Sequence, residues 1–291
     1  MHSKTKRLLT AGAVVAAGGL TAVAAMSVTG GGSADGPRPV SADEAQRMAQ
    51  ARFRVYRASP SAVTLRVTTT AGDTTIRAVV DHRRHRAVGM YDAEADGGRG
   101  LLAWDSSGVA VARGTEKGAA GKKPGAAGDG AAKPEESGRK GAEAARPGAS
   151  GTAVAETPAR EVLRAARGVE KKKWARRGFV GGPLDVGLRL VLGMASDRPE
   201  NAQLLAQSGP LWLRDDRIEG RSLDVFSGPR PRPQGSAAPS GSSPLAYWID
   251  DDGDLRRLTA TLGQSRTVTV DVTEHQVAGK LPAGPWKKPD D

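Results

Sequence analysis

The sequence predicts an α+β fold in which one large antiparallel sheet of about eleven strands packs against about three helices. Two stretches, 61–113 and 211–274, alternate apolar and polar residues with a period of two, which is typical of strands with one buried face. Turn residues, mainly Gly, Asp and Ser, separate these runs at the spacing of hairpins. Helical periodicity is clearest in short segments near 41–56, 183–192 and 200–207.

The first expected element is a helix that begins at Ser41. Ser41 and Glu44 have the spacing of a capping box, and apolar residues follow at helical spacing as far as Tyr56. Ser59-Pro60 ends this helix, because proline cannot continue it. A five-strand meander is expected next, around 63–67, 76–80, 88–90, 102–104 and 109–111.

The second half is expected to begin with helices and to end with a further series of strands. A short helix at 158–167 and a strand at 174–180 precede the helices that begin at Pro183 and Glu200. Ser208-Gly209-Pro210 ends the last helix. The remaining strands are expected around 211–213, 223–225, 245–249, 258–262 and 268–272.

Residues 1–28 predict a secretory signal peptide or an uncleaved signal anchor. Basic residues, among them Lys6 and Arg7, precede an apolar run at 8–28, and small residues at 22–24 suit cleavage. The apolar run is also just long enough to span a bilayer. In both cases the rest of the chain is expected outside the cytoplasm, either secreted or anchored in the cytoplasmic membrane.

Composition divides the rest of the chain. Residues 29–40 are expected to be a flexible spacer, 41–280 a single domain and 281–291 a polar tail. Segment 114–152 interrupts the domain and contains no Val, Ile, Leu or aromatic residue, so it is expected to be disordered. A Pro-rich loop at 228–243 is the second interruption.

The charge and the cysteine content exclude several kinds of chemical site. The chain has 291 residues, a formal net charge of +11 and no cysteine. The lack of cysteine excludes disulfides, thiolate metal sites and cysteine nucleophiles. An exported chain is not expected to meet nucleic acid despite its positive charge, and we expect a monomer.

The hairpin WIDDDGDLRRL at 248–258 is the most specific pattern in the chain. With the capped first helix, the meander and the mid-chain helices, it resembles the periplasmic lipoprotein-carrier superfamily, over about 41–113 and 172–280. Members include the chaperone LolA and mycobacterial lipoproteins of the LppX and LprG type, and there are actinobacterial relatives with an N-terminal leader. The resemblance implies a sheet curled into a half-open β-barrel, closed by helices, with an apolar cavity for acyl chains. Unlike the lipoproteins, this chain has no lipidated cysteine, and its insertion is unusually long.

One face of the predicted sheet is apolar and is expected to line such a cavity. Its candidate lining residues are Leu65, Val67, Ile76, Val88, Met90, Tyr247, Leu258 and Val270. If the cavity is open, phenylalanine at Ala78 or Ala260 should weaken binding of an acyl probe and leave stability nearly intact. In a packed core the same change should cost about 1–3 kcal/mol.

Other candidate sites have simpler interpretations. Asp250 and its neighbours surround Gly253, but Leu255 and Thr261 stand where calcium ligands are needed, so a hairpin turn is expected. His82 and His85 are expected in a solvated basic turn. No serine, histidine and acid form a recognisable triad, so we predict no enzymatic activity, no catalytic residue, no cofactor and no metal.

A basic cluster brackets Trp174. It consists of Lys171, Lys172, Lys173, Arg176 and Arg177. A membrane surface could bind such a cluster, and a solvated strand edge protected by lysines has the same sequence pattern.

Two functions fit these observations. The first is an exported cell-envelope module that holds an apolar chain, of a lipid or an acyl group, in a half-barrel cavity and acts as a lipid or lipoprotein carrier. The alternative is a membrane-anchored envelope sensor or scaffold that acts through a protein partner and binds no ligand.

Overall fold

The structure is a computed structural model that describes residues 36–95, 97–113, 156–235, 238–263 and 265–286. Two predicted segments, the leader at 1–28 and the insertion at 114–152, lie outside these residues. Within the described stretches, no helix is long and apolar enough to cross a membrane.

The described residues form twelve strands and four α-helices, which confirms the α+β prediction. The strands of the first half are β1 (Arg38–Pro39), β2 (Ser61–Thr69), β3 (Gly72–Asp81), β4 (Arg86–Ala93), β5 (Arg99–Asp105), β6 (Gly108–Arg113) and β7 (Ala175–Arg177). The later strands are β8 (Leu211–Ile218), β9 (Arg221–Ser227), β10 (Leu245–Ile249), β11 (Leu255–Thr261) and β12 (Thr267–Glu274). The helices are α1 (Ala42–Arg57), α2 (Pro158–Arg167), α3 (Pro183–Gly193) and α4 (Ala202–Gln207).

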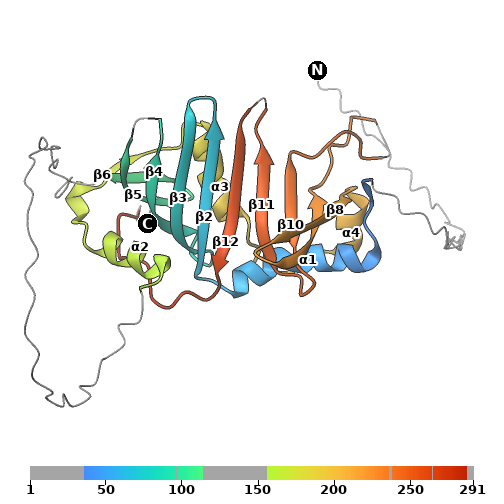
Figure 1. The fold of residues 1–291 in the computed structure, drawn as a ribbon, viewed down its shortest axis with the longest axis horizontal. Coiled ribbons are helices and arrows are strands. Elements are labelled where there is room, and N and C mark those ends of the chain that lie inside the picture. Colours follow the sequence, from blue (N-terminus) through green and yellow to red (C-terminus); the bar gives the residue numbers. More distant parts are fainter. Residues whose placement is uncertain (1–35, 96, 114–155, 236–237, 264, 287–291) are drawn as a thin grey trace, which may run out of the picture. The chain divides into compact units, whose positions relative to one another are not determined.

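All twelve of these strands belong to one antiparallel sheet (Figure 1). Their order is β1-β8-β9-β10-β11-β12-β2-β3-β4-β5-β6-β7. The pairing of β12 with β2, in which Val270 faces Leu65, joins the two halves of the chain. β1 and β7 lie at opposite edges, so the sheet formed by the described residues is curled but open, as expected of a half-barrel.

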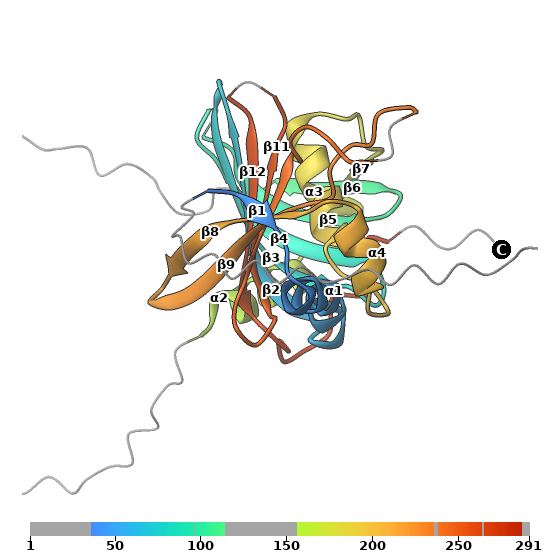
Figure 2. The same cartoon turned by 90° about the vertical axis from the view of Figure 1, so that its right-hand side faces the viewer.

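Helices cover both faces of the sheet. α1, α3 and α4 lie on one side, here called the inner face, and α2 lies on the other, the outer face (Figure 2). α3 packs against β2, β3 and β12, and α2 packs against β3 and β4. Strands β3 and β4 are therefore buried on both sides, which explains the consecutive buried residues at Ala78–Val80 and Ala87–Val88.

The capping box predicted for the first helix is present. The Glu44 backbone N–H donates to Ser41 Oγ at 3.2 Å, and the Ser41 N–H donates to the Glu44 carboxylate at 2.7 Å. Arg38 adds a 2.7 Å ion pair to the same carboxylate. Hydrogen bonds from Arg38 and Ser41 hold the pKa of Glu44 below its ordinary value.

The folded unit extends beyond the expected limits of 41 and 280. Arg38 and Pro39, expected in the flexible spacer, form β1 against Leu211 and Trp212 of β8. At the other end, Trp286 of the expected polar tail is half-buried, and its Nε1 donates to Pro282 O at 2.9 Å. Both segments are short and polar on average, but each contributes to a contact with a tryptophan ring.

Candidate binding site on the inner face of the sheet

Six of the eight expected lining residues lie on the inner face. They belong to, or pack against, the main hydrophobic cluster between the sheet and helices α1 and α3. Five of them form one continuous row of paired residues across β10, β11, β12, β2 and β3: Tyr247, Leu258, Val270, Leu65 and Ile76. Val67 lies on the same face of β2. The alternation of apolar and polar residues therefore identified a real, contiguous surface.

The other two expected lining residues require a correction. Val88 is fully buried on the outer face, and Met90 packs against the same outer cluster, beneath α2. On β4 the inner face is formed instead by Ala87 and Tyr91. The residues of β4 do alternate between two faces, as predicted, but the face assigned to Val88 and Met90 was wrong. α2 packs on the outer face of this strand, so that face is apolar as well.

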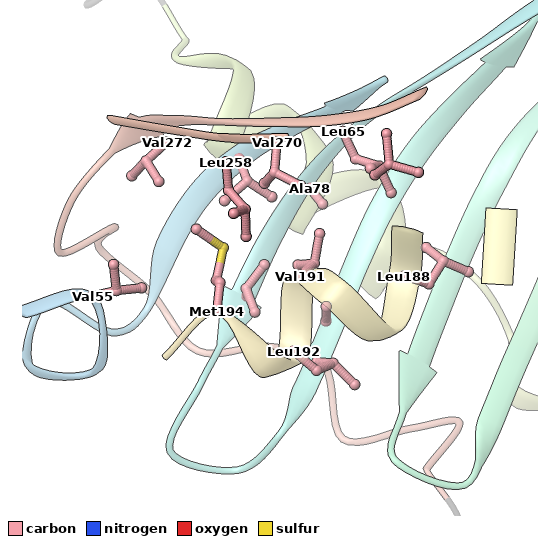
Figure 3. Close-up of a cluster of buried hydrophobic side chains, with 14 of the residues drawn as sticks. Val55, Leu65, Ala78, Leu188, Val191, Leu192, Met194, Leu258, Val270 and Val272 are labelled. Carbon is pink, nitrogen blue, oxygen red and sulfur yellow. The ribbon is translucent and has the colours of Figure 1, made fainter. Parts of the chain in front are cut away.

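The row of residues on the inner face is covered by α3. Figure 3 shows this helix beneath the strands that carry Leu65, Leu258 and Val270. A Cβ atom added to Gly187 would lie 3.2 Å from Leu65 Cδ1, so the helix backbone is in close contact with the sheet. Trp104 anchors the helix by donating from Nε1 to the Leu188 carbonyl at 3.0 Å. Protein atoms thus occupy the space in which an acyl chain was expected.

An apolar cavity remains beside this filled region. Its volume is about 70 Å³. It lies between α1, the segment around α4, and β10, and its lining residues are Met48, Ala51, Arg52, Glu200, Leu205, Pro229, Tyr247 and Ile249. Tyr247 is the one residue of the expected set that lines it. Burial raises the pKa of the Tyr247 hydroxyl, so this ring is neutral at physiological pH.

An ion pair contributes the charged part of the cavity wall. Arg52 of α1 pairs with Glu200, and a second guanidinium nitrogen of Arg52 donates to the Gly193 carbonyl at 2.8 Å. The Glu200 backbone N–H donates to Ala49 O at 3.0 Å. Sequence analysis missed this pair because its members are 148 residues apart and neither belongs to a motif.

The cover of the cavity is a short helix that packs against α1. α4 has six residues, and none of them is buried. Leu205 faces the cavity and is half-buried, whereas Leu204 is 64% exposed. So short a helix depends on its tertiary contacts for stability. Its contacts with α1 supply that stability.

A buried histidine is a second correction to the sequence analysis. His82, expected in a solvated turn, is fully buried, and its Nε2 lies 3.1 Å from Ser61 Oγ. Its Nδ1 is also buried and has no hydrogen-bond partner among the described residues. Burial lowers the pKa of His82 to about 4. Without an acid on Nδ1 or access for a substrate, this pair does not form a catalytic triad.

The acidic hairpin is a turn, as predicted. The Asp250 carboxylate accepts the Asp254 N–H at 2.8 Å and pairs with Arg256 Nε at 2.7 Å. The Gly253 N–H donates to the Asp250 carbonyl at 2.8 Å, which closes the turn. In the described stretches, no group of three or more carboxylates and histidines has the geometry of a metal site.

Several residues of the predicted basic cluster form ion pairs with carboxylates of this chain. Arg176 binds Asp105 at 2.9 Å, and Arg177 binds both oxygens of Asp185 at 2.7 and 3.0 Å. Lys172 pairs with Glu170 at 3.0 Å. β7 is an edge strand of the sheet, which favours the interpretation of this cluster as a protected strand edge. Membrane binding by this cluster of five basic residues stays a prediction.

Comparisons with known proteins identify a likeness of fold. No protein-family model and no curated protein matches this chain. Among solved structures, the chain is similar to an uncharacterised conserved protein from Thermus thermophilus, at 8% identity and a TM-score of 0.33. That match covers 82% of this chain and 91% of the other.

The names of two further similar structures refer to a protein family or to a function. A LolA superfamily protein from Nitrosomonas europaea matches at 11% identity and a TM-score of 0.22, over 84% of this chain and 96% of that one. A putative outer membrane lipoprotein-sorting protein domain from Vibrio parahaemolyticus matches at 8% identity and a TM-score of 0.24, over 82% and 95%. The family that the hairpins resemble is thus found among these neighbours. At these identities and TM-scores, only the chain's own residues can indicate a function.

Proposed function

We propose that this protein is an extracytoplasmic binding module that takes up the end of an apolar chain, such as an acyl group, on the inner face of its sheet. The observation that carries the proposal is the cavity between α1, α4 and β10, whose wall is apolar except for the Arg52–Glu200 pair. An apolar space with a few placed polar groups is the usual geometry of a small-molecule site.

The size of the cavity defines how the ligand would bind. A cavity of about 150 Å³ accommodates benzene, so the 70 Å³ present here has room only for the end of a chain. A longer chain requires α4, none of whose residues is buried, to move outward from α1. Ligand uptake would then displace Leu205 from the wall while α3 stays in place on the sheet.

The charged part of the wall favours an amphiphile. Arg52 carries a guanidinium whose partner, Glu200, comes from the movable segment beside α4. When that segment moves, a ligand carboxylate can replace Glu200 on Arg52 and keep the half-buried guanidinium paired. We therefore propose a fatty acid, or an acyl chain with an anionic head, as the ligand class.

A fluorescent fatty acid tests the proposal directly. The full chain is titrated with NBD-dodecanoic acid, and a saturable rise in fluorescence is expected. Leu205→Trp fills the cavity and should weaken binding at least tenfold, whereas Leu204→Trp, on the solvent side of the same helix, should leave it within twofold. Absence of saturable binding, or equal affinity of the two variants, would refute the proposal.

The alternative function has one specific observation in its favour. Because α3 fills most of the inner face, the domain already has a packed core without any ligand. A sensor or scaffold that acts through a protein partner needs no more than this. A parent protein that binds no acyl probe but keeps its cooperative unfolding would support this alternative.

A further inference from the structure

A second hollow lies on the outer face, away from the proposed acyl site. In Figure 2 the hairpin formed by β8 and β9 leans away from α1, α3 and α4, over the outer side of the sheet. Between this hairpin and strands β2, β11 and β12 there is a groove of about 360 Å³. Its lining residues are Thr64, Arg66, Ile218, Glu219, Arg221, Leu223, Arg256, Arg257, Asp271, Val272 and Thr273. We call it the arginine groove.

Two of its arginines are fixed in place by carboxylates. Arg257 binds Asp271 through Nε at 2.5 Å, and Arg256 binds Asp250 through Nε at 2.7 Å. The Arg257 guanidinium also lies 6.0 Å from the centre of the Trp248 ring. In the part of the chain that the structure describes, the terminal nitrogens of Arg257 form no hydrogen bond, so they remain available to a ligand.

The other two arginines have no partner of their own. Arg66 and Arg221 are both exposed, and among the described residues neither forms an ion pair or a side-chain hydrogen bond. Four guanidiniums thus line one groove together with two carboxylates, Asp271 and Glu219. Because the arginines outnumber the carboxylates in this lining, the groove has a net positive charge that favours a bound anion.

The surroundings of the groove limit the size of the anion. A neighbouring hollow shares Leu223 with the arginine groove, and its charged lining residues are four carboxylates and one arginine: Asp215, Asp216, Asp224, Asp251 and Arg217. An extended polyanion that followed the sheet in this direction would meet these carboxylates and be repelled. A compact anion could lie among the arginines without reaching this second hollow.

We propose that the arginine groove binds a phosphate group of a compact ligand. A planar guanidinium presents paired N–H donors that match two phosphate oxygens, and several such forks can converge on one group. The hydroxyls of Thr64 and Thr273 offer further donors at the same wall. This site is independent of the proposed acyl site, because it uses the opposite face of the sheet and none of the same residues.

Binding is tested first with inorganic phosphate and the full chain, by isothermal titration calorimetry in low-salt buffer. The parent protein should bind phosphate saturably, and Arg66→Gln/Arg221→Gln should weaken this binding at least tenfold. Arg221→Gln/Arg266→Gln is the control, because it removes the same charge but keeps Arg66 in the groove; it should retain an intermediate affinity. Circular dichroism and thermal unfolding verify that the variants fold.

A second experiment tests whether the phosphate group belongs to a soluble molecule or to a lipid. Vesicles of phosphatidylcholine with and without phosphatidic acid are compared in a sedimentation assay. Binding of inorganic phosphate indicates a soluble ligand. Binding of phosphatidic acid vesicles alone, if Arg66→Gln/Arg221→Gln weakens it, indicates a lipid headgroup. Both outcomes support the proposal. Loss of affinity that is equal in the test and control variants, or no binding in either arm, would overturn it. Tighter binding of a single-stranded oligonucleotide than of phosphate would also overturn it.

Discussion

Gly187 of α3 lies directly against Leu65 of β2, with 3.2 Å between Leu65 Cδ1 and the position that a Cβ atom on Gly187 would occupy. The same position lies 3.3 Å from the side chains of Val67 and Val268. A helix interior usually disfavours glycine by about 1 kcal/mol relative to alanine. Here the small residue allows α3 to approach the sheet closely enough to fill the inner face.

Gly187→Leu should therefore lower the free energy of unfolding by about 1–3 kcal/mol, because the added side chain overpacks a closed interface. Urea unfolding followed by tryptophan fluorescence measures this change. Gly193→Ala, at the end of the same helix with no atom within 4 Å of the added Cβ, should be nearly neutral. If both variants were equally stable, α3 could not be packed against β2 as described.

Phenylalanine at Ala78 or Ala260 should destabilise the protein by about 1–3 kcal/mol. Both alanines are 3% exposed and lie in the main hydrophobic cluster beneath α3, so a larger ring has no room. Ala71→Phe, in an exposed turn, is the matched control. Thermal unfolding distinguishes this packed core from the open cavity that the sequence led us to expect, which would tolerate both substitutions.

Local features of the fold could be predicted from sequence because neighbouring residues determine them. The capping box at Ser41 and Glu44 and the turn around Gly253 each depend on a few adjacent residues, and both are present. The choice of face for Val88 could not be predicted, since it depends on where α2 packs. Period-two alternation identifies two faces of a strand without indicating which face a distant helix will cover.

The candidate site was predictable only in part for the same reason. The row that includes Leu65 and Val270 was found from alternation alone. Whether this row lines a cavity or a core depends on how closely α3 approaches, and the sequence signal for that is a single glycine. The Arg52–Glu200 pair joins segments that only the tertiary structure brings together.

Asp185→Asn should lower stability by about 1–3 kcal/mol, the cost of leaving hydrogen-bonding groups unsatisfied in a partly buried network. Asp185 is 1% exposed and accepts from both Arg177 and the Val180 N–H, which fixes the segment that leads into α3. Burial opposes its charge, yet these hydrogen bonds hold the pKa of Asp185 below its ordinary value. Asp215→Asn, on the exposed side of β8, should change stability little. Equal melting temperatures for the two variants would contradict this role.

Stability should fall as the pH decreases from about 6.5 to about 4, because His82 is buried in its neutral form. Burial, with a smaller contribution from the charge on His85, lowers its folded-state pKa to about 4, while Asp81 opposes the shift. Between the two pKa values the unfolded state binds the extra proton, so the free energy of unfolding decreases toward acid. A difference of about 2.5 pKa units corresponds to a loss of about 3 kcal/mol.

His82→Gln isolates this effect from that of other titrating groups. Glutamine can keep a hydrogen bond to Ser61 Oγ but cannot take up a proton in this pH range. Urea unfolding is measured at pH 7 and at intervals down to pH 4 for both proteins, and the difference between them is plotted against pH. The parent should lose more stability than the variant over this range. Parallel curves would mean that the pKa of His82 is the same in the folded and unfolded states, and the lowered pKa attributed here to burial would then be wrong.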